Sequence, residues 1–301
     1  MNPDVIREMR RMVDDHFQSE DLKGLLHAFI EDKSAENSLW SSITLSTHYM
    51  LGGSSPCIES AAALTELVIL ALDIVDDLQD QDNVSKPWMK CPQAYTLNAV
   101  LSLHAILLTE LGRIGLSRLT GDMGRLLVQT IEGQQMDVSQ SVVSEADYIA
   151  MVRQKSGSLM RLACCMGYSL IDDLDRETVD RMNDLAECIG IMAQIANDVN
   201  DVLRYDVKND LLLKKRTLPI LFMLVDSKDE FPPIGQYYEG LISADEFLRH
   251  KQACMAYIRD SGCIEYSQVI RTLYADKAEE LLQSVPAVSP WRERFKEITF
   301  G

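Results

Sequence analysis

The sequence predicts an all-α fold, and two observations carry this prediction. Apolar residues recur at intervals of three and four along most of the chain, which is the spacing of one face of an α-helix. Glycine and proline fall mostly between these periodic stretches, where they would separate one helix from the next. We therefore expect about a dozen helices packed into one large bundle.

Five of the expected helices are longer and more apolar than the rest. They cover residues 58–78, 92–111, 120–139, 156–170 and 179–202. Two further helices should begin with capping boxes, at Ser144-x-x-Asp147 and Ser243-x-x-Glu246, in which a serine oxygen and a carboxylate satisfy free N–H groups reciprocally. Helices that are apolar around most of their circumference belong in a protein interior, so polar residues on them need an explanation.

Length, composition and charge narrow the class of protein. The 301 residues are 47% hydrophobic and 25% charged, which is typical of a globular protein with a large core. No linker divides them, so we expect a single domain over residues 1–301.

The 46 acidic and 29 basic side chains give a net charge of −17, and this argues against nucleic acid as a partner. The apolar runs are too short for a transmembrane segment. Residues 1–20 lack the apolar core of a secretory signal, so we expect a cytoplasmic protein, free or peripheral to the membrane.

Cysteine and histidine usage excludes two kinds of site. The seven cysteines are an odd number without a C-x-x-C pair, which fits neither a disulfide framework nor a zinc ribbon. The five histidines are scattered without metal-ligand spacing, so zinc chemistry and a histidine-dependent triad are both disfavoured.

The first candidate site is a run of carboxylates at the end of an apolar helix. Asp73, Asp76, Asp77 and Asp80 are separated by steps of three or four residues, so a helix stacks them on one face. Their repulsion costs about 0.2–0.5 kcal/mol per exposed pair, and they also oppose the negative end of the helix. A bound cation would relieve both penalties. The alternative interpretation is a solvated acidic helix end.

A second polar cluster interrupts another long apolar helix. Asp198 and Asp201 share a face, Asn197 is adjacent and Gln194 lies one turn earlier. Two such clusters could share Mg²⁺ ions, which usually keep several waters and are completed by substrate phosphates. The cations that a metal–diphosphate complex would still lack are present in segments 155–157 and 214–219. Each lysine taken alone is more commonly a solvated surface charge.

In these elements the sequence resembles the trans-isoprenyl diphosphate synthase family, over roughly residues 50 to 225. This family has an isoprenoid-synthase-type helical bundle around a central cavity, which two aspartate-rich motifs face. Its first motif, D-D-x-x-D, matches Asp76, Asp77 and Asp80. The other family elements follow in order and match Glu66 upstream, then Gly133, Gln134 and Asp137, then Lys155-Ser156-Gly157, then Asn197-Asp198-x-x-Asp201 with Asn for the leading Asp, and finally Lys215, Thr217 and Pro219.

The resemblance implies a Mg²⁺-dependent prenyltransferase that acts on an allylic prenyl diphosphate. Two or three Mg²⁺ ions would bridge the diphosphate and the protein. The implied metal ligands are Asp76, Asp80, Asn197, Asp198 and Asp201. The implied diphosphate-binding residues are Lys155, Lys215, Gln134, Asp137 and Gln194. The implied catalytic residues are Asp76, Asp77, Asp80, Lys155 and Asp198.

The prenyl tail would lie against the face of the helix upstream of the first motif. Val68, Ala71 and Leu72 are on that face, and ordinary helix core is the alternative role for all three. Ala71 stands where short-chain members often carry an aromatic residue, which suggests a pocket that is not blocked at ten carbons.

The acceptor side departs from the family pattern. Elongating members bind isopentenyl diphosphate through basic residues, but Ser54 and Ser55 follow the glycine pair where the family has Lys-Arg. Ile69 occupies the position of a histidine, and segment 83–88 contains Lys86 where an arginine pair is expected. Charge-assisted contacts are worth about 1.5–3 kcal/mol each, so this acceptor should bind poorly.

This departure is similar to one branch of the family, the isoprenyltransferases that modify a tryptophan of the bacterial competence quorum-sensing pheromone (the ComQ type, acting on ComX-type peptides). Segments 73–83, 88–90 and 97–103 carry the similarity. It implies transfer of a geranyl or farnesyl group to an indole ring of a pheromone precursor peptide. Asp73 or the departing diphosphate would accept the proton released afterwards. The family is commonly homodimeric.

Three other functions are open at this stage. The first is a conventional polyprenyl diphosphate synthase with an unusual acceptor site. The second is a class I terpene cyclase, whose second metal motif would end in Glu where this chain has Tyr205. The third is a non-catalytic subunit, which would have no reason to keep both carboxylate clusters. Residues 226–301 contain helical patterns but no assignable motif, and recognition of the peptide is a hypothesis for them.

Overall fold

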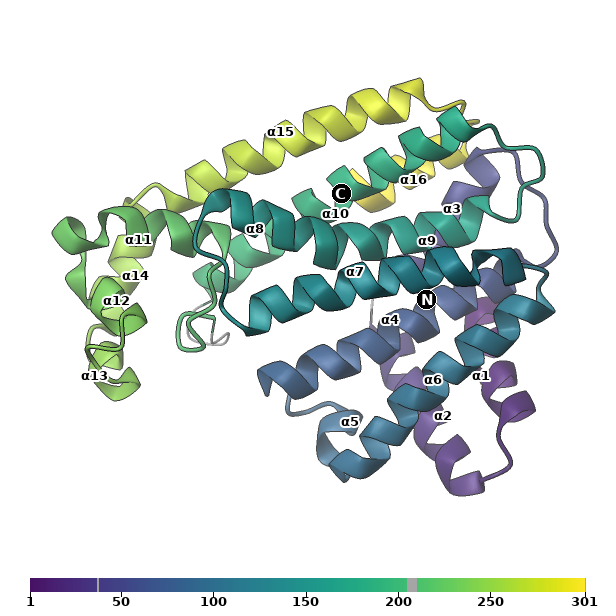
Figure 1. The fold of residues 1–301 in the computed structure, drawn as a ribbon, viewed down its shortest axis with the longest axis horizontal. Coiled ribbons are helices and arrows are strands. Elements are labelled where there is room, and N and C mark those ends of the chain that lie inside the picture. Colours follow the sequence, from purple (N-terminus) through teal and green to yellow (C-terminus); the bar gives the residue numbers. More distant parts are fainter. Residues whose placement is uncertain (37, 205–209, 301) are drawn as a thin grey trace. The chain divides into compact units, whose positions relative to one another are not determined.

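A computed structural model describes residues 1–36, 38–204 and 210–300, and every regular element in these ranges is a helix (Figure 1). The predicted all-α fold is confirmed. The first half of the chain contains α1 (Pro3–His16), α2 (Glu20–Ala35), α3 (Trp40–Met50), α4 (Ile58–Asp80), α5 (Pro87–Lys90), α6 (Gln93–Arg113), a 3₁₀ turn (Ser117–Leu119) and α7 (Thr120–Val138). The second half contains α8 (Glu145–Val152), a π-helical turn (Arg153–Gly157), α9 (Ser158–Tyr168), α10 (Arg176–Leu203), α11 (Leu218–Glu230), α12 (Pro232–Tyr238), α13 (Ala244–Leu248), α14 (Lys251–Asp260), α15 (Cys263–Ser284) and α16 (Trp291–Phe300).

The five long helices expected from the sequence correspond to α4, α6, α7, α9 and α10, with ends that differ by up to three residues. The largest change in character lies before α9. Residues 153–157 form a π-helical turn that continues α8 into α9, so no separate helix begins at Ser156.

One of the two predicted capping boxes is complete. At the start of α8, Ser144 Oγ accepts a hydrogen bond from the Asp147 N–H, and the Asp147 carboxylate accepts the Ser144 N–H at 3.0 Å. At the start of α13 the described hydrogen bonds contain only the serine half, in which Ser243 Oγ accepts the Glu246 N–H at 3.2 Å.

The described chain divides into two compact units, each made of separate segments. The first unit contains Met1–Leu127, Leu159–Asp184 and Leu281–Gly301, and the second contains Val128–Ser158 and Leu185–Glu280. The first aspartate motif therefore belongs to the first unit, and the second motif belongs to the second unit. The single domain expected over residues 1–301 stays a prediction.

Helix α4 forms the centre of the first unit. It packs against α1, α3 and α6 (Figure 1), and its residues from Ala61 to Ala71 are buried all around the helix. The last helix, α16, packs on α3, where the rings of Tyr49 and Trp291 stack at 4.6 Å. The Val288 N–H donates to the Met50 carbonyl at 2.8 Å. The core thus holds α4 and the end of α3 in fixed positions.

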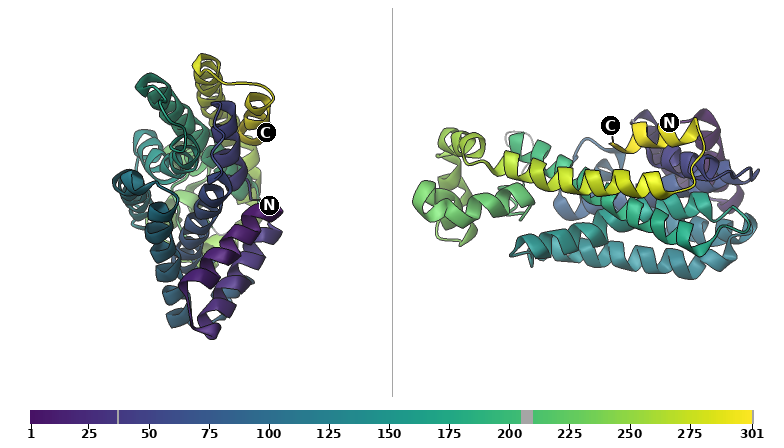
Figure 2. Two further views of the ribbon diagram at one scale, coloured as in Figure 1. Left: turned by 90° about the vertical axis from the view of Figure 1, so that its right-hand side faces the viewer. Right: turned by 90° about the horizontal axis from the view of Figure 1, so that it is seen from above.

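The second unit contains two clusters of buried side chains. One joins α8, α10 and α11 through Tyr148, Ile191, Ile195 and Leu221. The other lies among α11, α12, α13 and α14, four short helices that gather into one group (Figures 1 and 2). Beyond residue 225, where the sequence offered no motif, this group contains the end of α11 and all of α12, α13 and α14.

One described helix, α6, is long and apolar enough to cross a membrane by length and composition alone. Half of its most apolar window is buried inside the protein, and the helix packs against α4. Buried core helices meet the same test, so this is weak evidence for a membrane span. Its exposed side carries Leu97, Leu101 and Leu108, at spacings of four and seven residues that place them on one face of the helix.

Candidate active site

The first aspartate motif occupies the last two turns of α4. Asp76 and Asp80 lie one turn apart, and both are partly exposed. The helix ends directly after them because Gln81 adopts a left-handed conformation, with φ of 54°. The Gln81 side-chain amide donates to the Leu78 carbonyl at 2.6 Å and closes the helix end.

Asp77, between these two residues, is turned into the protein and is only 6% exposed. Its Oδ2 accepts the indole N–H of Trp88 at 2.7 Å, and its Oδ1 accepts the Asn83 side-chain amide at 2.6 Å. Burial raises the pKa of Asp77 to about 6, the two donors oppose this rise, and Asp82 adds to it. Both oxygens therefore bind the segment that follows α4, so the structure assigns Asp77 a structural contact in addition to the catalytic role that the motif implied.

Asp73, the predicted candidate proton acceptor, forms an ion pair with Lys33 of α2. The Lys33 Nζ lies 2.6 Å from Asp73 Oδ2, and the lysine side chain is 6% exposed. Burial raises the pKa of Asp73, and the lysine partly opposes this shift.

Glu66 matches the glutamate that lies upstream of the first motif in the family pattern. In the structure it caps a neighbouring helix. Its Oε1 accepts the Ser41 N–H and its Oε2 accepts the Ser38 hydroxyl, each at 2.7 Å. Helix α3 has no side-chain cap from its own N-cap residue. A fully buried carboxylate on α4 thus satisfies one of the free N–H groups at the start of α3.

The loop at the predicted acceptor position is fixed by a buried histidine. His48 Nδ1 donates to the Gly167 carbonyl at 2.9 Å, and its Nε2 accepts the Ser55 N–H at 3.0 Å. Burial lowers the pKa of His48, in keeping with a neutral ring that needs one donor and one acceptor nitrogen. Ile69, in place of the family's histidine, is buried in the core.

Lys86, the one basic residue of segment 83–88, is bound by one carboxylate of α2 and one directly after it. Its Nζ lies 2.7 Å from Asp32 Oδ2 and also contacts Glu36. The same Nζ stands 5.1 Å from the centre of the Trp88 ring. This lysine holds the segment against α2.

In the second unit, Lys155 lies on the π-helical turn between α8 and α9. Its Nζ is 2.9 Å from Asp137 Oδ2 on α7, so the G-Q-x-x-D and K-S-G elements meet. A Cβ on Gly133 would stand 2.4 Å from the Lys155 backbone N, and one on Gly190 would stand 2.6 Å from the Ser156 carbonyl oxygen. These two glycines let α7 and α10 approach the turn closely. π-helical turns are frequent at functional sites.

A chain of hydrogen bonds connects this turn to the second aspartate motif. The Ser156 hydroxyl donates to Gln194 Oε1 at 2.7 Å, and Gln194 Nε2 donates to Asp198 Oδ1 at 2.7 Å. The Tyr148 hydroxyl donates to Asp198 Oδ2 at 2.6 Å. Burial raises the pKa of Asp198 to about 7, and the two donors oppose that rise.

Tyr148 is the residue of this site that the sequence reasoning missed. It lies on the apolar side of α8, fully buried, so its spacing marks it as core. The contact with Asp198 joins residues fifty positions apart, and no local pattern indicates such a pair.

The remaining predicted site residues are placed as follows. Asn197 is exposed and Asp201 is partly exposed at the end of α10, and Gln134 is partly exposed on α7. Val68 and Ala71 are buried on α4 and Leu72 is partly buried there; their role in a prenyl pocket stays a prediction. Tyr205, which entered the comparison with terpene cyclases, lies outside the described residues.

The carboxylates of each unit are suited to magnesium chemically. In the described parts of the chain no three His, Cys, Asp or Glu side chains gather closely enough to form a complete metal site. Mg²⁺ is usually bound by one or two carboxylates together with waters and substrate phosphates. Asp76 and Asp80 on α4, and Asp198 and Asp201 on α10, are oxygen donors of that kind. The residues present therefore fit this ion.

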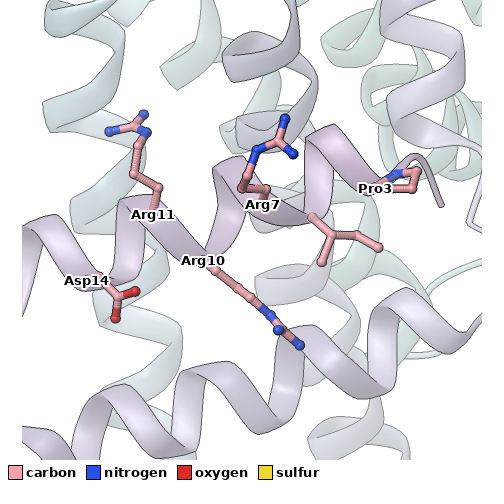
Figure 3. A pocket seen from close by; sticks show the side chains of 6 residues that line it. Pro3, Arg7, Arg10, Arg11 and Asp14 are labelled. Atoms are coloured by element: carbon pink, nitrogen blue, oxygen red, sulfur yellow. The ribbon is translucent and has the colours of Figure 1, made fainter.

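A surface hollow on α1 contains none of the predicted site residues (Figure 3). Pro3, Ile6, Arg7, Arg10, Arg11 and Asp14 line it. Two of its arginines form ion pairs along the helix, Arg7 with Asp4 at 2.5 Å and Arg11 with Asp15 at 2.7 Å. The hollow therefore gives no reason to move the candidate site away from the aspartate motifs.

The chain is similar to known prenyltransferases and prenyl diphosphate synthases. The profile of the polyprenyl synthetase family matches residues 38–246. The tryptophan prenyltransferase ComQ of Bacillus subtilis subsp. natto (strain BEST195) is 29% identical over 283 residues, which are 92% of this chain and 85% of that protein. ComQ of Bacillus subtilis (strain 168) is 27% identical over 304 residues, 96% of this chain and 95% of that protein. A geranylfarnesyl diphosphate synthase of Aeropyrum pernix is 27% identical over 270 residues, 82% of each chain.

Solved structures with the same fold include the heptaprenyl diphosphate synthase of Staphylococcus aureus. It superposes with a TM-score of 0.82 and 19% identity, covering 99% of this chain and 96% of that chain. A decaprenyl diphosphate synthase of Rhodobacter capsulatus gives a TM-score of 0.83 at 16% identity, covering 98% and 94%. At such identities the comparison establishes the isoprenoid synthase fold.

Proposed function

Since the chain belongs to the polyprenyl synthetase family and is a prenyltransferase, we propose that it transfers a geranyl or farnesyl group from an allylic diphosphate to a tryptophan of a pheromone precursor peptide. The similarity to three ComQ tryptophan prenyltransferases over most of the chain supports the peptide acceptor.

The observation that carries the proposal is the lack of available basic side chains at the predicted acceptor position. A second diphosphate would need cations, but the loop after α3 is fixed by the neutral His48 through the Ser55 N–H. The nearest substitute along the chain, Lys86, is already bound by Asp32 and Glu36. Breaking such pairs to bind isopentenyl diphosphate would cost free energy. A neutral indole can bind without such a cation.

On the donor side, the chain supplies cations and hydrogen-bond donors for a leaving diphosphate. In the reaction the allylic C–O bond breaks, and its electron pair leaves with the diphosphate. Lys155, held by Asp137 on its π-helical turn, and Lys215 would stabilise the charge that develops on the oxygens. Asp76 and Asp80 of the first unit, and Asp198 and Asp201 of the second unit, are the carboxylates that would hold Mg²⁺, which would supply further positive charge for the diphosphate.

The bond to the acceptor forms at the electron-rich C3 of indole, which attacks the allylic cation without a strong base. Because C3 of a tryptophan already carries the side chain and no hydrogen, the proton lost afterwards leaves from nitrogen. Of the two candidate acceptors, Asp73 is already paired with Lys33 at 2.6 Å, so the departing diphosphate is the better acceptor in this proposal.

Two further features belong to the proposal as expectations. The enzyme would act in the cytoplasm, where prenyl diphosphates and precursor peptides are both available, free or peripheral to the membrane. It would form a homodimer, and the exposed Leu97, Leu101 and Leu108 of α6 are the apolar surface to test first. Replacing Leu101 by Glu should then shift the mass measured by light scattering from dimer to monomer.

The test offers two acceptors separately. Purified protein with Mg²⁺ and geranyl or farnesyl diphosphate is given either isopentenyl diphosphate or a Trp-containing precursor peptide, and products are measured by mass spectrometry. We expect a prenyl mass increase on the peptide only. A matched peptide with Trp replaced by Ala should stay unmodified.

A further inference from the structure

The loop before α11, residues 210–217, contains the diphosphate-binding lysine of the family pattern, and its backbone is held by side chains from elsewhere in the second unit. The Tyr238 hydroxyl donates to the Lys215 carbonyl at 2.7 Å, and the Tyr237 hydroxyl donates to the Leu212 carbonyl at 2.6 Å. Gln140 Nε2 donates to the Leu213 carbonyl at 2.8 Å. Three of the loop's carbonyl groups are thus bound by neighbouring side chains.

The same two tyrosines also hold the cations on either side of Lys215. The Lys214 Nζ stands 4.6 Å from the centre of the Tyr237 ring, and the Arg216 guanidinium stands 5.9 Å from the centre of the Tyr238 ring. Both distances are within the range of cation–π contacts. Lys214 is in the left-handed conformation, with φ of 56°, which non-glycine residues adopt only where their surroundings hold them.

We propose that Tyr237 and Tyr238, adjacent residues at the end of α12, are positioning residues for Lys215. They fix its backbone from one side and keep both neighbouring cations on aromatic rings, so that the Lys215 ammonium is the one directed to the diphosphate. This inference rests on the proposed function, in which Lys215 contacts the leaving group. It also gives a role to helix α12, in the region beyond residue 225 where the sequence offered no motif.

The arrangement matters because lysine is a long, flexible side chain whose ordering opposes binding. With its carbonyl and both neighbours fixed, the backbone from which the Lys215 side chain extends is already ordered. A loop that moves by about 1 Å would misplace a charge that has to meet a diphosphate oxygen, and displacements of that size can cost about 100-fold in rate.

The chain offers a matched control for the experiment. Tyr257 lies in the same cluster of buried side chains as Tyr237, and its hydroxyl donates to the Met223 carbonyl on α11 at 3.0 Å, outside the loop. Tyr238→Phe and Tyr257→Phe therefore remove the same kind of bond, and only the first touches the loop. Tyr237→Phe is a second loop variant, available if Tyr238→Phe does not fold.

Binding of inorganic diphosphate in the presence of Mg²⁺, measured by calorimetry, separates a positioning role from a purely structural one. We expect Tyr238→Phe to weaken diphosphate binding by about five- to tenfold, the equivalent of one hydrogen bond. Tyr257→Phe should bind as the wild type does. In a Lys215→Ala background, Tyr238→Phe should cause no further loss, because a residue that acts through Lys215 has nothing left to position.

Two results would overturn the inference while leaving the proposed function intact. One is wild-type affinity for diphosphate in both tyrosine loop variants. The other is a loss in the double variant equal to the sum of the single losses. If the wild-type protein binds diphosphate but modifies no peptide, the peptide acceptor is wrong and the positioning role stands.

Discussion

Gly133 on α7 is the position where one methyl group tests the geometry of the candidate site most sharply. A Cβ there would lie 2.4 Å from the Lys155 backbone N and 2.9 Å from its Cα. Ordinary contact begins near 3.4 Å, so Gly133→Ala must push the π-helical turn and α7 apart by about 1 Å. Backbone atoms at both sides of the contact prevent relief by a side-chain rotation.

The expected magnitude combines two opposing effects. Overpacking of this kind costs about 1–3 kcal/mol, and replacing glycine by alanine inside a helix favours folding by about 1 kcal/mol. We expect a net loss of up to about 2 kcal/mol, or up to about 3 °C in the midpoint of thermal unfolding of a chain of this length. The loss of activity should be larger, about 100-fold in kcat/KM, because the displaced group includes Lys155.

The matched control lies on the same helix. Gly124 has no atom within 4 Å of its would-be Cβ, so Gly124→Ala should raise stability by up to about 1 kcal/mol and leave turnover unchanged. Thermal unfolding and steady-state prenyl transfer are measured for both variants. Wild-type kcat/KM in Gly133→Ala would refute the close approach of α7 to the turn and the role of that turn in holding Lys155.

Three other residues give predictions of the same kind. Trp88→Phe leaves the buried Asp77 without its indole donor and should lower the free energy of unfolding by about 1–3 kcal/mol in urea denaturation. An unchanged value would contradict a stabilising hydrogen bond between Trp88 and Asp77. Burial lowers the pKa of His48 below its unfolded value of 6.5, so stability should fall as pH drops below about 6.5, and His48→Asn should flatten that dependence in thermal unfolding. Tyr148→Phe removes a bond that favours the charged form of Asp198, so the acid limb of the pH–rate profile should move to higher pH; a profile identical to that of the wild type would exclude this contact from function.

The sequence predicted the helical architecture and the two aspartate motifs, because both depend on local spacing. The side of α4 that carries Asp76 and Asp80 follows from the helical repeat alone. The burial of Trp88 and its edge-on contact with the Phe29 ring at 5.6 Å, by contrast, are visible only in the structure.

What could not be predicted depends on contacts between distant parts of the chain. Nothing local indicates that Asp77 binds Trp88, that Lys86 pairs with α2, or that Tyr148 binds Asp198. The π-helical turn at Lys155 likewise has no simple sequence signature, and only the atoms next to Gly133 and Gly190 explain why those positions lack side chains.

The direct test of the central claim is the identity of the acceptor. Wild-type protein with Mg²⁺ and a labelled allylic diphosphate is given isopentenyl diphosphate and the Trp-containing precursor peptide together, and the label is followed by mass spectrometry. The altered acceptor side predicts that the label appears on the peptide tryptophan and that no longer prenyl diphosphate forms. Label in elongated prenyl diphosphates, with an unmodified peptide, would contradict it and identify a conventional chain-elongating synthase.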